Sequence, residues 1–237
     1  MKNIDTEPPE SRVGAGIFGH PAIPYVAPFA AFILLLGVNR YVPVEPGYVY
    51  AIWFILIFGL LLTVSRPVIP FRISNYLGSA LLGVAVFALW IAPDVLWPPY
   101  RQSWLFNNSL LGSPKSTLDP SLKSSLLFIV FRILNSVVNV PVLEELFWRG
   151  WLMRWLISTD FRKVPMGAYA AQSFWTVAVL FASEHGSYWD VGLVTGAIFN
   201  WWMVRTRSLA DCIFCHAVTN GCLAVYVLSR DQWQYWL

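Results

Sequence analysis

Charged residues are scarce in this chain of 237 residues: 12% are Asp, Glu, Lys or Arg, whereas 57% are hydrophobic and 16% are aromatic. In soluble globular domains roughly a quarter of the residues are charged, so this composition excludes an ordinary soluble domain. Several apolar runs reach the roughly 20 residues that a helix needs to cross a bilayer. The composition therefore predicts an integral membrane protein whose length leaves no room for a large soluble domain.

A strong excess of one sign of charge is also lacking. The formal net charge is +3, and the basic residues are scattered over short connections. Proteins that bind nucleic acid gather such residues in a patch or stripe, so we expect the lipid bilayer as a partner and no nucleic acid.

Cysteine is equally scarce. Cys212, Cys215 and Cys222 all lie in the last apolar run, which argues against a secreted disulfide framework.

The pattern of a cleavable signal peptide is missing as well. Residues 1–22 are polar and contain Pro8, Pro9 and three acidic residues, and the apolar run begins only near Tyr25. A signal peptide has a short basic start that is followed directly by an apolar stretch. We therefore expect a polar N-terminal segment over 1–22 and a single transmembrane domain over 23–237, whose first span is an uncleaved anchor.

Apolar runs bounded by proline, glycine and charge predict an all-α fold, a polytopic bundle of seven or eight transmembrane helices. The fourth run is too long for one straight crossing at about 1.5 Å per residue. Pro141 in its middle removes a helical hydrogen bond, so the run is either one kinked helix or two helices. Segment 93–122 is the one long connection, and we expect it on the membrane surface as a lid. The expected spans are 23–39, 47–65, 74–92, 123–157, 167–185, 189–204 and 208–229.

The basic residues of the connections predict the orientation in the membrane. With seven crossings and the N-terminus inside, most of them fall on the inside, as the positive-inside rule requires. We therefore expect a cytoplasmic N-terminus and an outside C-terminus, although an eighth crossing near Pro141 reverses everything after it. The inside residues are Lys2, Arg12, Arg66, Arg72, Arg154, Arg162, Lys163, Arg205 and Arg207, and the outside residues are Arg40, Arg101, Lys115, Lys123 and Arg230.

Ionisable side chains inside the spans are few, and each is a functional candidate because a charge in lipid is costly. Glu145 and Arg149 are four residues apart with the acid on the N-terminal side, which is the orientation that favours a helical ion pair. Glu144 lies roughly 100° around the helix from Glu145, so it needs another partner or a water-filled cavity. A carboxylate in such a cavity is a candidate general base.

The chain has three histidines. His20 lies in the polar N-terminal segment and receives no role, whereas His185 and His216 lie in or at the end of apolar runs. A single histidine in an apolar helix is most often a satisfied core residue. Here two of them accompany a pair of glutamates and an intramembrane arginine, and Asn220 follows His216 by one helical turn. The set therefore predicts a polar site within the membrane.

Three short motifs follow one another along the chain, and each is weak when taken alone. They are Glu144-Glu145-Leu-Phe-Trp-Arg149 (E-E-x-x-x-R), Phe181-Ala-Ser-Glu-His185 (F-x-x-x-H) and His216-Ala-Val-Thr-Asn220 (H-x-x-x-N). Together, in so apolar a chain, they resemble the CAAX-prenyl-protease and bacteriocin-processing family of intramembrane proteases, also called the Abi family. The resemblance covers roughly residues 123–225.

This resemblance implies that the chain hydrolyses a peptide bond of a membrane-associated protein or peptide. Glu144 together with His185 would deprotonate a water molecule, and that water would attack the scissile carbonyl. His216 and Asn220 would hold the oxyanion of the tetrahedral intermediate, which is usually the largest electrostatic contribution in acyl transfer.

The resemblance also implies supporting roles for three residues. Glu145 and Arg149 would be structural or would hold the end of the substrate, and Phe181 would pack behind the site. The substrate stays open. Such proteins remove a C-terminal tripeptide from a prenylated protein, process a leader or bacteriocin, or serve a protein-sorting system.

Metal dependence is a further open point. Glu144, His185 and His216 are plausible Zn²⁺ ligands, since a catalytic zinc site has three protein ligands and a water molecule. Asn220 is a poor zinc ligand but a good neutral donor to an oxyanion. We therefore favour a Glu/His mechanism without a cofactor and keep zinc as the alternative.

Two other functions fit part of the pattern. Cys212, Cys215 and His216 have the C-x-x-C-H spacing of a covalent haem c site, with His185 or Met153 as the second axial ligand. The chain would then be a membrane c-type cytochrome. A non-catalytic transporter or scaffold, in contrast, would use the same polar cluster to bind a ligand. Replacing the candidate base separates an enzyme from a scaffold, because a scaffold should keep its cellular effect.

Small residues in the last three runs have a simpler interpretation as packing residues. Cysteine in an apolar helix behaves as a small hydrophobic side chain, which is the interpretation we favour for Cys212 and Cys215. Gly192 and Gly196 form a small-x-x-x-small pattern, and this pattern predicts that two helices approach closely there.

Overall fold

The computed structural model describes residues 19–38, 41, 44–116 and 118–236. Within these ranges the chain forms seven helices and no strand apart from an isolated bridge between Asn108 and Gly112. The predicted all-α bundle is therefore confirmed. The helices are α1 (Ile23–Val38), α2 (Pro46–Leu60, continued by turns to Val68), α3 (Tyr76–Leu96), a composite helix over Leu126–Trp155, α7 (Ala171–Ser183), α8 (Trp189–Thr206) and α9 (Leu209–Arg230).

The lengths and apolar character of these helices fit a membrane protein. Four are long and apolar enough to cross a bilayer, and two further apolar helices, α1 and α7, are shorter. Helix ends lie within about four residues of the predicted ones; the largest differences are the end of α3 at Leu96 and the start of α7 at Ala171. The predicted orientation, with a cytoplasmic N-terminus, stays a prediction.

The fourth apolar run forms one helix, Leu126–Trp155, which we call the central helix. Its first π turn, Asn135–Asn139, lies just before Pro141. Proline has no N–H, and its ring clashes with the carbonyl four residues earlier in a regular α-helix. A π turn shifts the pairing from the fourth to the fifth residue and so relieves the clash. Its parts are α4 (Leu126–Leu134), α5 (Val140–Glu145) and α6 (Met153–Trp155), with a second π turn over Leu146–Leu152.

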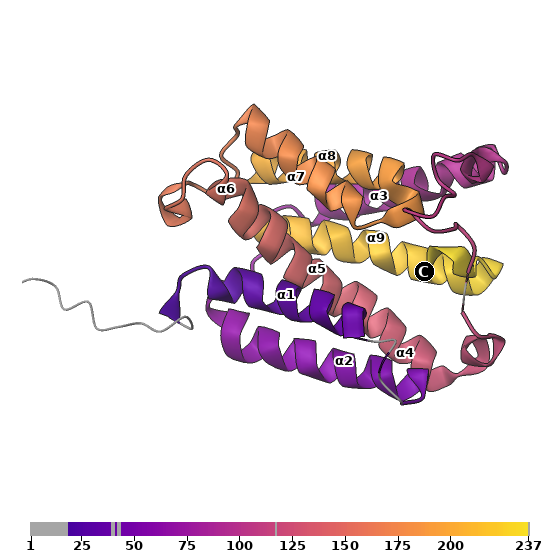
Figure 1. Ribbon diagram of the computed structural model, residues 1–237. Helices are drawn as coiled ribbons and strands as arrows, with labels where there is room; N and C mark the ends of the chain where they lie inside the picture. Colours follow the sequence, from indigo (N-terminus) through magenta and orange to yellow (C-terminus); the bar gives the residue numbers. More distant parts are fainter. Residues whose placement is uncertain (1–18, 39–40, 42–43, 117, 237) are drawn as a thin grey trace, which may run out of the picture.

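The central helix runs diagonally through the bundle, with α1 and α2 on one side and α3, α7 and α8 on the other, while α9 lies against it (Figure 1). Glycines allow the closest approaches. A Cβ on Gly83 of α3 would lie 2.6 Å from the Cys215 carbonyl oxygen in α9. A Cβ on Gly192 of α8 would lie 3.2 Å from His185 Nδ1 in the turn after α7, and one on Gly196 would lie 3.1 Å from Phe181 Cδ1 in α7. The predicted close packing at the two glycines of α8 is therefore confirmed.

The connection between α3 and the central helix is held to the bundle by a buried arginine. Arg101 is 4% exposed, and its guanidinium pairs with Asp94 at 2.9 Å and with Asp190 at 2.8 Å. It also donates a hydrogen bond of 2.7 Å to the Ser187 carbonyl. Leu111 of the same connection lines a cavity that Glu144 and His185 also line. The segment predicted to form a lid thus contributes part of a cavity wall.

Candidate active site

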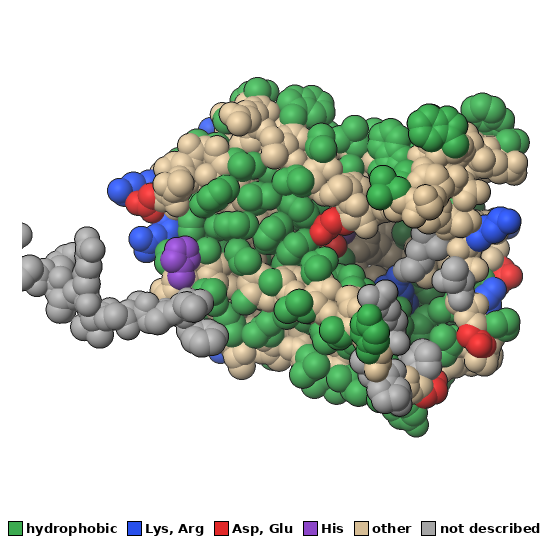
Figure 2. All heavy atoms as spheres, viewed as in Figure 1, with side chains coloured by type: hydrophobic (Ala, Val, Ile, Leu, Met, Phe, Trp, Pro, Cys, Tyr) green, Lys and Arg blue, Asp and Glu red, His purple; other side chains and the backbone are tan. Residues whose placement is uncertain are grey.

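A cavity of about 440 Å³ lies between the central helix, α7 and α9. All four residues predicted to be catalytic line it, although they come from segments far apart in the sequence. Figure 2 shows a hollow on the face seen there, with an acidic side chain beside it. The four residues are Glu144 from the central helix, His185 from the turn after α7, and His216 and Asn220 from α9.

The two neighbouring glutamates occupy different environments. Glu144 lines the cavity and Glu145 does not, although Oε2 of each carboxylate lacks a hydrogen-bond partner within the described chain. Glu145 is 0% exposed and turns away from the cavity into the protein core. The turn of roughly 100° per residue separates the two carboxylates. Only Glu144 is therefore placed to meet a water molecule or a ligand in the cavity.

Glu145 connects a buried arginine to one of the cavity histidines. Its Oε1 accepts from Arg149 Nη1 at 3.0 Å and contacts His216 Nδ1 at 2.9 Å. Arg149 also donates to Asn200 Oδ1 at 2.9 Å and to the Gly196 carbonyl at 3.3 Å. The predicted Glu145–Arg149 ion pair is present, and Arg149 is 0% exposed. Because these donors are occupied inside the protein, the geometry supports the structural role rather than capture of the substrate's end.

The hydrogen bonds of the two histidines indicate which ring nitrogens face the cavity. His185 Nδ1 lies 2.8 Å from the Phe181 carbonyl, which accepts but cannot donate, so this nitrogen carries a proton. His216 Nδ1 faces the Glu145 carboxylate and donates in the same way. In both rings the second nitrogen, Nε2, therefore remains available to a water molecule or a ligand in the cavity. The backbone carbonyl and the carboxylate thus orient the two rings.

Phe181 packs behind this site. The ring is 1% exposed, and the Arg149 guanidinium lies over it at 4.7 Å from its centroid. The ring centroids of His185 and His216 lie 4.8 and 6.3 Å from that of Phe181. One aromatic ring therefore separates the arginine from the cavity and contacts both histidines.

Asn220 is anchored by a backbone carbonyl that Pro141 has left without its usual partner. Its Nδ2 donates to the Ser136 carbonyl at 2.7 Å. A π turn would pair that carbonyl with the N–H of residue 141, and proline has none. An amide nitrogen carries two hydrogens, so the second N–H of Asn220 remains for a ligand. The proline thus contributes to the orientation of a residue on another helix.

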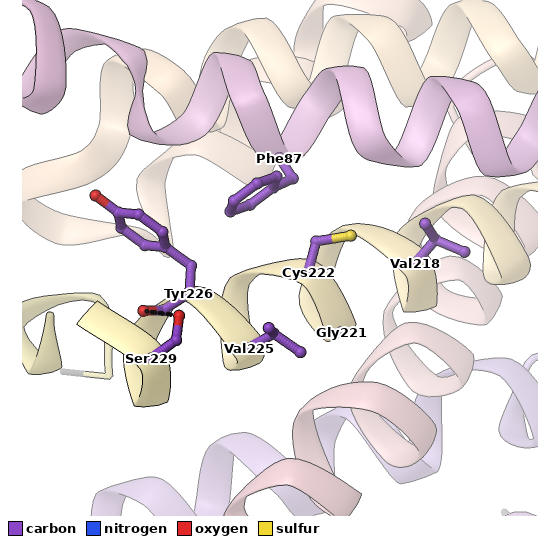
Figure 3. A pocket seen from close by; sticks show the side chains of 7 residues that line it. All are labelled: Phe87, Val218, Gly221, Cys222, Val225, Tyr226 and Ser229. Carbon is purple, nitrogen blue, oxygen red and sulfur yellow. Dashed lines mark hydrogen bonds between the residues drawn. The ribbon is translucent and has the colours of Figure 1, made fainter. Parts of the chain in front are cut away.

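The cysteines are packing residues in the described structure. Cys212 and Cys215 are 0% exposed, and Cys212 Sγ contacts the Phe199 carbonyl and the Met203 sulfur. Covalent haem attachment requires thiols that the haem can reach, so this burial disfavours the cytochrome interpretation. Cys222 lines a separate, open apolar groove of about 500 Å³ between α3 and α9, where it faces Phe87 (Figure 3). Among the described residues that line this groove, none is a carboxylate or a histidine.

The residues proposed as zinc ligands meet the same cavity but are not grouped tightly. Among the residues that the structure describes, no three His, Cys, Asp or Glu side chains converge closely enough to hold a metal ion. His216 directs one ring nitrogen to Glu145 rather than into the cavity. Whether the site uses a metal stays a prediction.

Three polar residues near the cavity received no role from the sequence. Asn200 bridges Arg149 to the Phe174 carbonyl, while Glu184 and Arg132 line the cavity. Glu184 occupies one of the variable positions of F-x-x-x-H, so the motif does not point to it. Arg132 and Asn200 were available from the sequence, since each is a polar residue within a predicted span.

Comparison with known proteins identifies a family for the part of the chain that carries the motifs. Residues 125–222 match the family model described as type II CAAX prenyl endopeptidase, Rce1-like. This stretch contains all three motifs and the four candidate catalytic residues. No curated protein and no solved structure matched the chain. The resemblance inferred from the motifs is therefore confirmed at the level of the family, and the family implies a protease.

Proposed function

Because residues 125–222 form an Rce1-like domain, we propose that the protein is an intramembrane endopeptidase that cleaves membrane-associated proteins or peptides with an activated water molecule. The observation that carries this proposal is the cavity itself. It brings together a carboxylate, two histidines and an amide from three segments, and contacts with the surrounding protein orient both rings and the amide.

In the proposed first step Glu144 takes a proton from water, and the oxygen attacks the carbonyl carbon of the scissile bond. His185 Nε2 accepts a hydrogen bond from the same water, because its Nδ1 already donates to the Phe181 carbonyl. A general base in this position contributes roughly 10²- to 10⁴-fold to the rate. When the C–N bond breaks, the proton on Glu144 passes to the leaving amine, which restores the carboxylate.

The carbonyl oxygen becomes an oxyanion during this attack, and His216 and Asn220 are proposed to hold it. The free N–H of the Asn220 amide is one donor. His216 donates from Nε2 when it is protonated, and the Glu145 carboxylate that it shares with Arg149 lies 2.9 Å from its Nδ1. Donors fixed before the reaction stabilise the transition state without further reorganisation.

We favour this mechanism without a metal, as an amide donor serves an oxyanion better than it serves Zn²⁺. Chelator treatment followed by zinc addition tests the preference on purified protein. Unchanged activity after chelation supports it. Loss of activity on chelation and full recovery with zinc would show that the preference is wrong.

The proposal itself is tested on the membrane peptides of cells that express the wild type or Glu144→Gln. An endopeptidase generates peptides or new termini that are present with the wild type and missing with the variant. A transporter or scaffold generates none, and its cellular effect survives the substitution. Identical peptide sets from the two cell lines, at equal protein levels, would count against the enzyme.

A further inference from the structure

Four residues that line the cavity have a buried polar side-chain atom without a hydrogen-bond partner among the described residues. These atoms are Arg132 Nε, Glu144 Oε2, Tyr188 Oη and Thr195 Oγ1. The proposed mechanism gives a role to Glu144 alone. Of the other three side chains, that of Thr195 lies on α8, the helix that packs against both histidines of the cavity.

The Thr195 hydroxyl lacks a bond that other helical threonines of this chain make. A threonine in a helix commonly donates to the carbonyl four residues earlier. Thr63, Thr206 and Thr219 do so, at 2.8, 2.9 and 3.1 Å. Thr195 is 2% exposed, and its Oγ1 has no such bond. A buried hydroxyl without a partner destabilises the folded state, so its presence beside the cavity points to a partner that arrives with the substrate.

Two contacts fix the register between α8 and α9. Cys212 Sγ lies 3.8 Å from the Met203 sulfur, and the centroid of the His216 ring lies 5.1 Å from that of Phe199. Four residues forward along α9 are therefore matched by four residues back along α8. The two helices run antiparallel, and each successive turn of one lies opposite a turn of the other.

The same register brings Thr195 opposite Asn220, one turn further along each helix. Thr195 is also close to the other end of the cavity. A Cβ on Gly192, three residues before Thr195, would lie 3.2 Å from His185 Nδ1, and three residues span about 4.5 Å of helix. The Thr195 side chain thus lies on the cavity wall at the level of the proposed oxyanion donor and within one turn of the histidine beside the water.

We propose that the Thr195 hydroxyl donates a third hydrogen bond to the oxyanion, beside Asn220 and His216. The attacking water directs its two hydrogens to Glu144 and His185 in the proposed mechanism, so it has none left for Thr195 to accept. The oxyanion, in contrast, has room for a further donor. A threonine hydroxyl rotates its hydrogen to suit the acceptor and donates whatever the charge on His216. This inference rests on the proposed function and adds a catalytic residue outside the three motifs.

Thr195→Val tests the inference, because valine resembles threonine in shape and has no hydroxyl. The purified full chain is reconstituted in phosphatidylcholine vesicles with a peptide whose cleavage in cells depends on Glu144. We expect kcat to fall about tenfold to a hundredfold, the range for a hydrogen bond to a charged group. KM should stay near that of the wild type, because the bond strengthens only as the oxyanion forms. Thr195→Ser keeps a hydroxyl and should recover most of kcat.

Thermal unfolding distinguishes this role from a structural one. Thr195→Val should unfold at or above the temperature of the wild type, since it removes a buried hydroxyl that has no partner. Thr219→Val is the matched control. It makes the same change on the same cavity wall, but the Thr219 hydroxyl already donates to a backbone carbonyl. The control should keep kcat and unfold at a lower temperature.

Three outcomes would overturn the inference. They are a wild-type kcat in Thr195→Val, a raised KM with an unchanged kcat, and a loss of kcat that Thr195→Ser does not restore. If Thr195→Val unfolds early, Thr195→Ala replaces it as the variant without a hydroxyl. A second unstable variant would make the hydroxyl structural, and a stable one with wild-type kcat would remove it from the reaction.

The same assays separate the inference from the proposed function. If the wild type cleaves the peptide faster than Glu144→Gln does and Thr195→Val equals the wild type, the function stands and the third donor is wrong. If the wild type cleaves the peptide no faster than Glu144→Gln, the proposed function fails and the inference fails with it.

Discussion

Two faces of the central helix show how one motif serves two purposes. The face of Glu144 borders the cavity. The face of Glu145 is closed, and its carboxylate joins Arg149 and His216 inside the core. We propose that the first face meets water and substrate, whereas the Glu145 carboxylate on the second face orients the His216 ring.

Glu144 and Glu145 have the same side chain and are adjacent in the sequence, and yet their surroundings differ. The two glutamates differ by one residue, but a turn of roughly 100° sends them to different surroundings. Removing the first carboxylate should therefore alter the chemistry, and removing the second should alter the stability. Substitutions at the cavity and in the core test this distinction.

The largest effect is expected for Glu144→Gln on cleavage. Glutamine keeps the shape of the side chain but cannot take a proton, so kcat should fall on the order of a thousandfold. The unfolding temperature should stay near that of the wild type, because Glu144 has few partners to lose. Cleavage rates and thermal unfolding of the purified proteins check both points. A variant that unfolds early would mean that this face is structural too.

Glu145→Gln should mainly reduce stability. It leaves Arg149 buried with a weakened partner, and breaking a buried pair in this way costs about 3 kcal/mol. The double variant Glu145→Gln with Arg149→Met should recover part of that loss, since it removes the unpaired charge. Chemical unfolding of the three proteins measures the coupling. Additive losses in the double variant would show that the two residues do not act as a pair.

Asn220→Ala should lower kcat by about a hundredfold, the usual consequence of removing one donor to an oxyanion. Thr219→Val is its control. Thr219 is adjacent and lines the same cavity, but its one hydroxyl hydrogen is directed to the Gly83 or the Cys215 carbonyl rather than to a ligand. The control should lose about 1 kcal/mol of stability and keep its kcat. If both variants lose the same activity, the effect comes from α9 packing and not from an oxyanion contact.

The smallest effect is expected for Gly192→Ala. The new Cβ would lie 3.2 Å from His185 Nδ1, so α7 and α8 must separate slightly, at a cost of about 1 kcal/mol. Activity should fall with the displacement of His185. Gly221→Ala in α9 is the control, because a Cβ there meets no atom within 4 Å. It should be neutral or slightly stabilising. Thermal unfolding and cleavage assays of both variants check this. A Gly221→Ala variant that loses more stability or activity than Gly192→Ala would contradict the prediction.

Much of the fold followed from the sequence because membrane spans have a strong local signal. Apolar runs near 20 residues gave the seven helices and most of their ends. The sequence left open whether Pro141 splits the fourth run, since the answer depends on partners elsewhere. A π turn relieves the clash, and Asn220 of α9 donates to the Ser136 carbonyl. Contacts of this kind join residues more than eighty positions apart, and no local pattern contains them.

The sequence predicted which residues form the candidate site but not most of the contacts between them. Three motifs gave the polar side chains, and the ion pair of Glu145 followed from helical spacing. The contact from Glu145 to His216 and the place of Asn200 beside Arg149 depend on how three helices pack. Arg132 could have been found as a charge within a span, but only the cavity shows that it has no partner.

The most direct test of the central claim, that Glu144 activates a water molecule, is cleavage in water enriched in ¹⁸O. The wild type should place one ¹⁸O in the new C-terminal carboxylate at the rate of cleavage, and hydroxylamine should trap no acyl-enzyme. Glu144→Gln, folded and in the same vesicles, should incorporate almost none in the same time. Incorporation by Glu144→Gln at the wild-type rate, or a trapped acyl-enzyme, would contradict the account.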